Sequence, residues 1–142
     1  MAGDTGGLAK VTCAFANEMK ARGHTVSLVY ADERGGDFFF PLDGSIPSYD
    51  IRNYYGKRVG LPLSFRLKRE VLRTFSKQKA RTVNVEFFEK YLVQPLREVV
   101  QNVQPDVIVS FQPAATKMFI FDLQLDIPIV TMSHGNPEEY FV

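Results

Sequence analysis

Three short apolar segments, each preceded by a stretch with helical periodicity, constrain the fold of this chain more than any other feature. They are Thr25 to Ala31 (TVSLVYA), Asp106 to Phe111 (DVIVSF) and Ile127 to Met132 (IPIVTM). Segments that are apolar throughout indicate strands buried on both faces, and strands that alternate with helices indicate parallel pairing. The pattern therefore predicts an α/β fold in which helices cover both faces of a doubly wound, mostly parallel sheet.

The first helical segment has recognisable ends. Its apolar residues recur at spacings of three and four, and they are Leu8, Val11, Phe15 and Met19. This spacing predicts an amphipathic helix, and Gly23 follows it at a position where helices commonly end. Residues 32–60 are rich in Gly, Pro and Asp, and they predict a long loop with a small edge strand at Tyr49 to Tyr54.

Further helices are expected in the second half of the chain. Residues 64–81 and 85–103 predict two long helices, and Pro95 predicts a kink or a break in the second near Val93. Residues 114–125 are apolar and predict a helix between the last two strands.

A glycine turn, Gly6-Gly7, opens the first helix with no strand in front of it. In doubly wound sheets such a turn normally follows the first strand, which occupies a central position. We therefore expect the fold to lack its first strand. The unpaired edge that this leaves is expected to lower the stability or to promote self-association.

The net charge of +1 conceals a concentration of basic residues in one segment. Residues 57–81 contain nine Lys or Arg and a single acid, Glu70. Placed on one helix, five of these form a stripe, and they are Arg66, Arg69, Arg73, Lys77 and Arg81. The stripe predicts an anionic partner such as a membrane surface, or else a solvated face over a core-packed helix. The near-neutral total charge argues against nucleic acid as the partner.

Localisation and redox chemistry follow from two absences in the sequence. No apolar run approaches the length of a membrane span, and residues 1–5 lack the pattern of an export signal. Cys13 is the single cysteine, so it forms no internal disulfide and has no partner at metal-ligand spacing. We expect a cytoplasmic protein without a metal, peripheral at the inner face of the membrane if the basic stripe binds there.

Candidate site residues lie in turns that follow predicted strands or open helices. Because ligands of such sheets bind at the carboxyl ends of strands, residues 3–7, 110–113 and 133–137 are expected to converge. The N–H groups at Gly6 and Gly7 suit a phosphate, although a flexible helix cap is the alternative. His134 would donate to a sugar hydroxyl or phosphate, or else bond a neighbouring carbonyl as a loop histidine. His24 is expected to be structural.

The order of these segments is similar to a known family. Residues 6–29 (GGLAKVTCAFANEMKARGHTVSLV) resemble the opening of GT-B retaining glycosyltransferases of family GT4, in which a Gly-Gly-x-x-Arg turn starts a helix ending in Arg-Gly-His-x-Val. PDVIVSFQP and IPIVTMSHG resemble the later strands, and FFFPLDGSIPSYDI resembles the long loop. The resemblance implies that residues 1–142 are the Rossmann-like, acceptor-side N-terminal domain, and that the C-terminal donor-binding domain is absent.

The resemblance also implies an activity and a set of site residues. The activity is metal-free hexosyl transfer with retention, from a nucleotide-diphosphate sugar to a sugar or lipid-linked acceptor, in polysaccharide or glycolipid synthesis. Gly6 and Gly7 would approach the donor diphosphate, with Lys10 at a position that is usually Arg. His134, followed by Gly135, would contact the transferred sugar as the catalytic residue. Ser110 and Gln112 would contact the acceptor.

The missing lobe would complete the donor site, so the chain alone is expected to be inactive. A competing interpretation is a non-enzymatic α/β domain that binds an anionic partner through its basic helix. In that case Gly6, Gly7 and His134 are structural. A dinucleotide-binding fold is disfavoured, because no Gly-x-Gly-x-x-Gly and no acidic residue at the matching position after the second strand are present.

Overall fold

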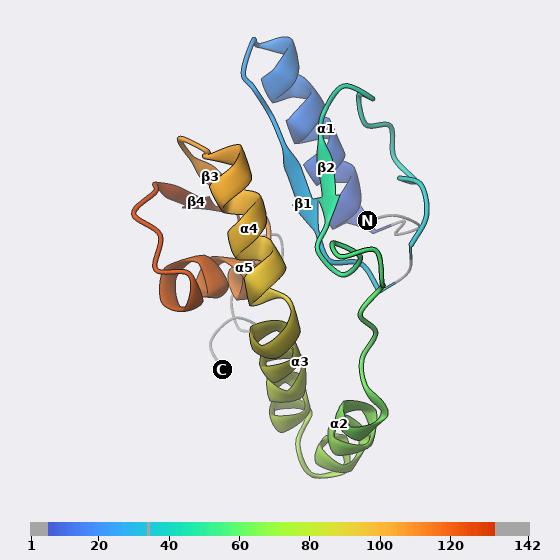
Figure 1. Ribbon diagram of the computed structural model, residues 1–142. Helices are drawn as coiled ribbons and strands as arrows, with labels where there is room; N and C mark the ends of the chain where they lie inside the picture. Colours follow the sequence, from blue (N-terminus) through green and yellow to red (C-terminus); the bar gives the residue numbers. More distant parts are fainter. Residues whose placement is uncertain (1–5, 34, 133–142) are drawn as a thin grey trace. The chain divides into compact units, whose positions relative to one another are not determined.

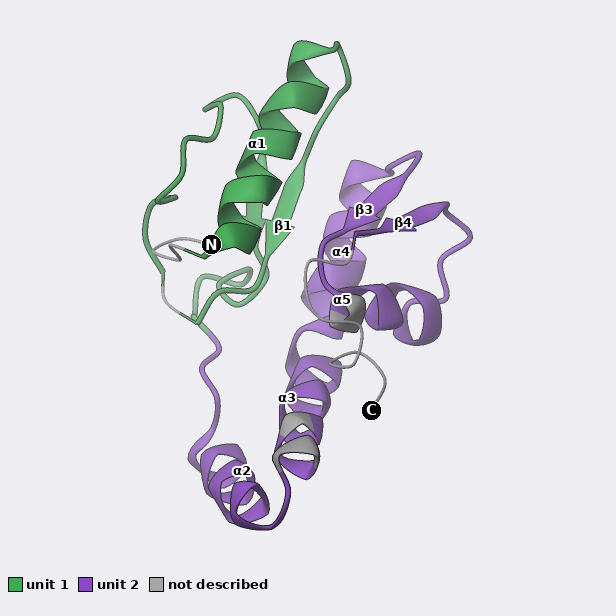
Figure 2. Ribbon diagram, turned by 180° about the vertical axis from the view of Figure 1, so that it is seen from behind, with its two compact units in different colours: residues 1–58 green, residues 59–142 purple. Residues whose placement is uncertain are grey.

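The computed structural model describes residues 6–33 and 35–132, which belong to two compact units, residues 1–58 and residues 59–142 (Figure 2). In the described residues each unit combines at least one helix with one pair of parallel strands, which confirms the α/β class and the parallel pairing. The described residues form two separate two-stranded sheets rather than one continuous sheet. Each strand is three residues long, so each sheet is small.

The N-terminal unit consists of helix α1 (Gly7–Ala21) and strands β1 (Leu28–Tyr30) and β2 (Ser48–Asp50). The strands pair in parallel, with Leu28 opposite Ser48 and Tyr30 opposite Asp50. The short strand predicted at Tyr49 to Tyr54 in the long loop is confirmed as β2, which begins one residue earlier and ends at Asp50. A small core joins helix, strand and loop, and it contains Ala16, Leu28 and Ile46 with Val26, Phe38 and Leu42 packed around it.

Helix α1 buries a different face from the one that its largest apolar residues predict. The buried residues are Ala9, Thr12, Cys13 and Ala16, whereas Val11 is exposed. The Thr12 hydroxyl donates to the Leu8 carbonyl oxygen at 2.8 Å, so this polar group is satisfied inside the unit. Small side chains let the helix approach its neighbours closely. The thiol of Cys13 is buried on this face of the helix.

The end of α1 is a Schellman motif. The Gly23 N–H donates to the Lys20 carbonyl oxygen at 2.9 Å, and the His24 N–H donates to the Met19 carbonyl oxygen at 3.2 Å. Gly23 has a φ of 91°, which is the left-handed conformation that favours glycine. The predicted helix end at Gly23 is confirmed, and the backbone of His24 has the expected structural role.

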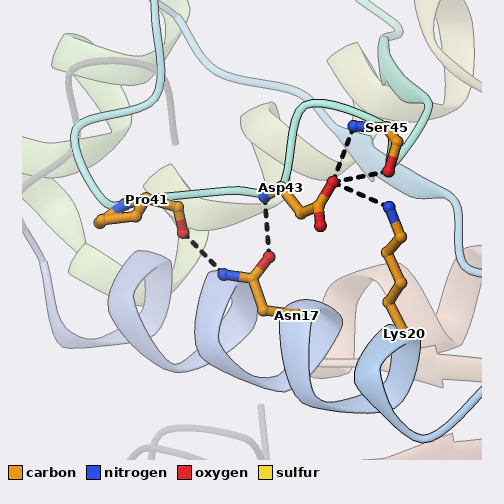
Figure 3. Close-up of polar contacts among 5 residues, drawn as sticks. All are labelled: Asn17, Lys20, Pro41, Asp43 and Ser45. Atoms are coloured by element: carbon orange, nitrogen blue, oxygen red, sulfur yellow. Dashed lines mark hydrogen bonds and ion pairs between the residues drawn. The ribbon is translucent and has the colours of Figure 1, made fainter.

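Side chains of α1 also hold the loop between the two strands (Figure 3). The Asn17 side chain accepts from the Asp43 N–H at 2.8 Å and donates to the Pro41 carbonyl oxygen at 3.0 Å. Oδ1 of Asp43 accepts from Lys20 Nζ at 2.8 Å and from the Ser45 N–H at 2.9 Å. These hydrogen bonds lower the pKa of Asp43. The hydrogen bond from Lys20 has the largest effect, followed by those from Ser45. The loop is therefore tied to α1 at two residues about one turn apart, Asn17 and Lys20.

The C-terminal unit contains four α-helices, a π-helical turn and one parallel strand pair within the described residues. Its elements in order are α2 (Leu63–Phe75), α3 (Lys77–Tyr91), α4 (Val93–Val103), β3 (Ile108–Ser110), α5 (Pro113–Lys117), η1 (Met118–Asp122) and β4 (Ile129–Thr131). In the sheet Ile108 lies opposite Ile129 and Ser110 opposite Thr131. The helix predicted over residues 114–125 is thus divided into α5 and η1.

The prediction of a single helix over residues 64–81 is wrong, because the helical conformation is interrupted at Ser76. Ser76 has an extended backbone, with φ −162° and ψ 127°, and its side chain accepts from the Lys79 N–H as the N-cap of α3. Helix α2 packs on α3 beyond this break, with Phe65 edge-on to Phe87 and Tyr91. The predicted five-residue basic stripe is therefore shared between two helices.

The predicted break near Pro95 is confirmed. Helix α3 ends at Tyr91 and α4 begins at Val93, which places Pro95 in the first turn of α4. The N–H groups of a first turn have no acceptor within the helix, so proline is tolerated there. Large side chains from α3, from α4 and from Leu92 between them are buried in this unit, and they include Val83, Phe87, Leu92, Leu96 and Val99.

Candidate functional site

The N-terminus of α1 and the carboxyl ends of β1 and β2 lie at the same end of the N-terminal unit. Figure 1 shows α1 running opposite to β1, so the helix begins near the point where both strands finish. In parallel α/β proteins ligands bind at this end, because strand carboxyl ends and helix N-termini meet there. This end of the unit is the candidate site.

The first turn of α1 has the features expected of an anion-binding helix start. Gly6 is the N-cap residue with an extended backbone, and as a glycine it has no side chain of its own to cap the helix. The first turn holds no acidic residue, so no carboxylate there neutralises the positive end of the helix dipole. Gly7 and Lys10 are exposed, and a Cβ placed on Gly7 would meet no atom within 4 Å.

Two arginines hold the segment that follows β1. Arg52 is buried, and its Nε donates to the Ala31 carbonyl oxygen at 2.9 Å. Arg58 donates from Nη1 to the Asp32 carbonyl oxygen at 2.8 Å, and its Nη2 forms an ion pair with Asp50 at the end of β2. Gly35 leaves room for this side chain, because a Cβ there would lie 2.8 Å from Nη2 of Arg58.

Burial changes the ionisation of two groups in this cluster. It lowers the pKa of Arg52, because removing a guanidinium from water disfavours its charged form. It raises the pKa of Tyr30, and the negative charge of Asp50 adds to this increase. Tyr30 is therefore neutral at physiological pH, and its ring packs edge-on against Phe38. The cluster holds the segments that follow β1 and β2 in place, and the start of α1 at the same end of the unit is exposed.

The sequence reasoning missed this arginine–aspartate cluster. The signal that could have found it is the position of charged residues directly after short strands, at the edge where a parallel sheet binds ligands. Asp50 ends β2 and Arg52 follows it by two residues.

The two predicted acceptor residues belong to the C-terminal unit and have local roles there. Ser110 is buried at the end of β3, and its hydroxyl donates to the Gln112 carbonyl oxygen at 2.9 Å. The same carbonyl accepts from the Thr116 N–H at 3.1 Å, which joins the strand end to α5. The Gln112 side chain is exposed. Gly6, Gly7 and Lys10 belong to the N-terminal unit.

The remaining predicted residues fall into two groups. His134 and Gly135 lie outside the described residues. Arg66, Arg69 and Arg73 belong to α2, while Lys77 and Arg81 belong to α3 and their side chains are outside the described part of the structure.

Within residues 6–33 and 35–132, no three His, Cys, Asp or Glu side chains are grouped so that they could hold a metal ion. In the same residues no helix combines the length and the apolar character needed to cross a membrane. Comparisons with models of protein families, with curated protein sequences and with solved structures gave no match for this chain.

Proposed function

We propose that this chain is the N-terminal, acceptor-side lobe of a retaining GT-B glycosyltransferase that uses a nucleotide-diphosphate sugar. The observation that carries the proposal is the start of α1 at the Gly6-Gly7 turn, at the end of the unit where two parallel strands finish. That is where the resembling family brings the donor diphosphate to a Gly-Gly turn. Both strand pairs are parallel, as the Rossmann-like sheet of such a lobe requires.

On this proposal the residues have separate tasks. Backbone N–H groups of the first turn of α1 stabilise the negative charge of the leaving diphosphate, and Lys10 adds a mobile positive charge beside them. The arginine–aspartate cluster keeps the adjoining strand ends in place. His134 contacts the transferred sugar, and Ser110 and Gln112 belong to the acceptor side. In the resembling family a donor-binding lobe supplies the rest of the donor site.

The first test uses Gly7, because the structure separates folding from ligand approach at this residue. Alanine at Gly7 meets no atom within 4 Å in the folded protein, so Gly7→Ala is expected to fold normally. A bound phosphate would meet the added methyl group. We expect millimolar diphosphate to shift the amide signals of residues 6–9 in the ¹⁵N-labelled chain, and Gly7→Ala to weaken this response on the order of 10-fold.

Gly44→Ala is the matched control, because a Cβ there also meets no atom within 4 Å and the residue lies in the loop held by α1. Unchanged signals at residues 6–9, or an equal response in wild type and Gly7→Ala, would contradict the role of this turn.

The second test measures sugar transfer by a protein that contains this chain together with a donor-binding lobe. His134→Ala is expected to lower turnover by about 10²- to 10³-fold, the effect of losing one hydrogen-bond donor to a transition state. His24→Ala is the control, since the structural role of His24 is carried by its backbone N–H. Normal turnover in His134→Ala would leave His134 with a structural role only.

A further inference from the structure

Helix α2 carries a row of large apolar side chains that the described residues leave largely uncovered. The row is spaced by four residues and consists of Leu63, Leu67, Val71 and Phe75, whose exposed fractions are 71%, 60%, 58% and 80%. No residue of α2 is buried. We call these four residues the α2 apolar row. Scattered exposed apolar residues need no explanation, but a continuous row along one helix marks an interaction surface.

The row lies on the side of α2 that faces away from α3. At about 100° per residue the row spans about 120°, and Phe65 lies about 140° from its middle. Phe65 is the residue that packs on α3, edge-on to Phe87 and Tyr91. The sector of the row contains two further residues, Ser64 and Thr74, which are exposed and uncharged. This face of the helix is therefore apolar and free of charge along its whole length.

Opposite charges flank the row, one on each side. Lys68 and Glu70 lie about 80° from the middle of the row, in opposite directions around the helix. Lys68 pairs with Glu86 of α3 at 2.6 Å, and its ammonium group has three hydrogens to donate. Glu70 lies 3.5 Å from Arg69 and 3.8 Å from Arg73, and exposed pairs of this length are weak. Both flanking charges can therefore interact with a further group.

We propose that the α2 apolar row docks on the same row of a second copy of this chain, with the two helices parallel and in register. A surface that closes a dimer about a twofold axis must be complementary to itself. In this arrangement the flank with Lys68 faces the flank with Glu70 of the partner subunit, and the reverse pair forms on the other side. The two residues differ by about 3 Å in height along the helix, which their long side chains span.

The charges also exclude the other simple arrangement. In an antiparallel pair each flank meets the same flank of the other copy, which places Lys68 beside the partner's Lys68 and Glu70 beside the partner's Glu70. Such like charges repel. The arginines of α2 lie at least about 120° from the middle of the row, so they stay outside the contact in either case. They are Arg66, Arg69 and Arg73.

The size of the row predicts a weak, reversible dimer. At the exposed fractions of its residues, the row offers on the order of 400 Å² of apolar surface in each copy. With the flanking side chains, a pair of copies then buries about 800–1,000 Å², which is the lower end of specific interfaces. We therefore expect a dissociation constant between about 10 μM and 1 mM.

Sedimentation velocity of the chain over this concentration range measures the dimer directly. Phe75→Ser is expected to weaken the dimer on the order of 10-fold or more, because each copy loses a large apolar side chain from the contact. Phe121→Ser, at a residue that is 66% exposed on η1, is the matched control and is expected to dimerise as wild type does.

Charge reversal tests the parallel arrangement. Glu70→Lys places two lysines on facing flanks, so two attractive pairs become repulsive and the dimer is expected to weaken on the order of 10-fold at low salt. Glu89→Lys changes the net charge by the same amount at an exposed residue of α3, and it is the control. Circular dichroism checks that each variant keeps its helices.

Three outcomes would overturn the proposal. The first is a chain that stays monomeric at about 1 mM. The second is a dimer that Phe75→Ser and Phe121→Ser leave equally strong, since the contact would then lie elsewhere on the chain. The third is an equal effect of Glu70→Lys and Glu89→Lys, which would refute the pairing of the flanks. None of these results depends on glycosyl transfer, so the docking surface and the proposed function stand or fall separately.

Discussion

Replacing Phe65 with alanine tests how α2 is held on α3. The half-buried Phe65 ring lies 6.2 Å from the Phe87 ring and 6.1 Å from the Tyr91 ring, both edge-on. Each such pair contributes about 0.5–1.5 kcal/mol, and removing the half-buried ring costs about 1 kcal/mol more in lost burial. Phe65→Ala should therefore weaken the packing of α2 by about 2–4 kcal/mol.

A 13-residue helix is marginal in water by itself, so losing this packing should open α2 without unfolding the rest of its unit. In amide hydrogen exchange we expect the protection of α2 to fall by about 30- to 1,000-fold, while α4 keeps its protection. Phe75→Ala is the control, because it removes the same side chain from the same helix at an exposed position. Equal loss of protection in the two variants would refute the reasoning, since it would mean that the aromatic contacts with α3 do not hold the helix.

Three further predictions concern the N-terminal unit. Gly23→Ala should destabilise it by about 1–2 kcal/mol in urea denaturation, because the φ of 91° disfavours a side chain, whereas Gly44→Ala should be close to neutral. Asp43→Asn should lower the free energy of unfolding at neutral pH. The difference in this free energy between the variant and the wild type should shrink as the pH falls below about 4. The reason is that the lowered pKa of Asp43 stabilises the folded state only while the carboxylate is ionised. Cys13 should react with a disulfide reagent at least about 100-fold faster in the denatured than in the native chain, because burial shields the thiol and raises its pKa; similar rates would show that the α1 interface opens freely.

Local chemistry explains which parts of the fold were predictable. The end of α1 follows from Gly23, since the left-handed conformation at that position is a property of one residue. The break between α3 and α4 follows from Pro95, whose missing N–H confines it to a first turn. In both cases the determining residue lies within one turn of the boundary, so a sequence pattern contains the information.

The break at Ser76 was missed for the opposite reason. Basic and apolar residues keep helical spacing on both sides of it, and serine occurs inside helices as well as at their caps. What favours two helices is the contact of Phe65 with Phe87 and Tyr91, which requires α2 to fold back on α3. That contact joins residues more than 20 positions apart, and periodicity along one helix does not contain it.

The buried face of α1 was mispredicted because hydrophobicity was given more weight than size. Leu8, Val11, Phe15 and Met19 are the larger apolar residues, yet Ala9 and Ala16 are more deeply buried. A helix that packs closely against a short strand and a loop needs small side chains at the contact, because each added methylene pushes the elements apart. The division of the strands into two small sheets was also not predicted, since strand pairing depends on residues far apart in the chain.

The candidate site shows how strand ends can be interpreted more fully. The prediction gave weight to the Gly6-Gly7 turn and overlooked Arg52, although both lie at the ligand-binding end of a parallel strand pair. A buried arginine needs acceptors, and the carbonyl groups of a chain that has just left a strand supply them, as the Ala31 carbonyl does here. A charged residue two positions after a short strand is therefore evidence for a buried polar cluster at the strand end. In this chain, Asp50 at the end of β2 and Arg52 two residues later are the charged residues to which that reasoning applies.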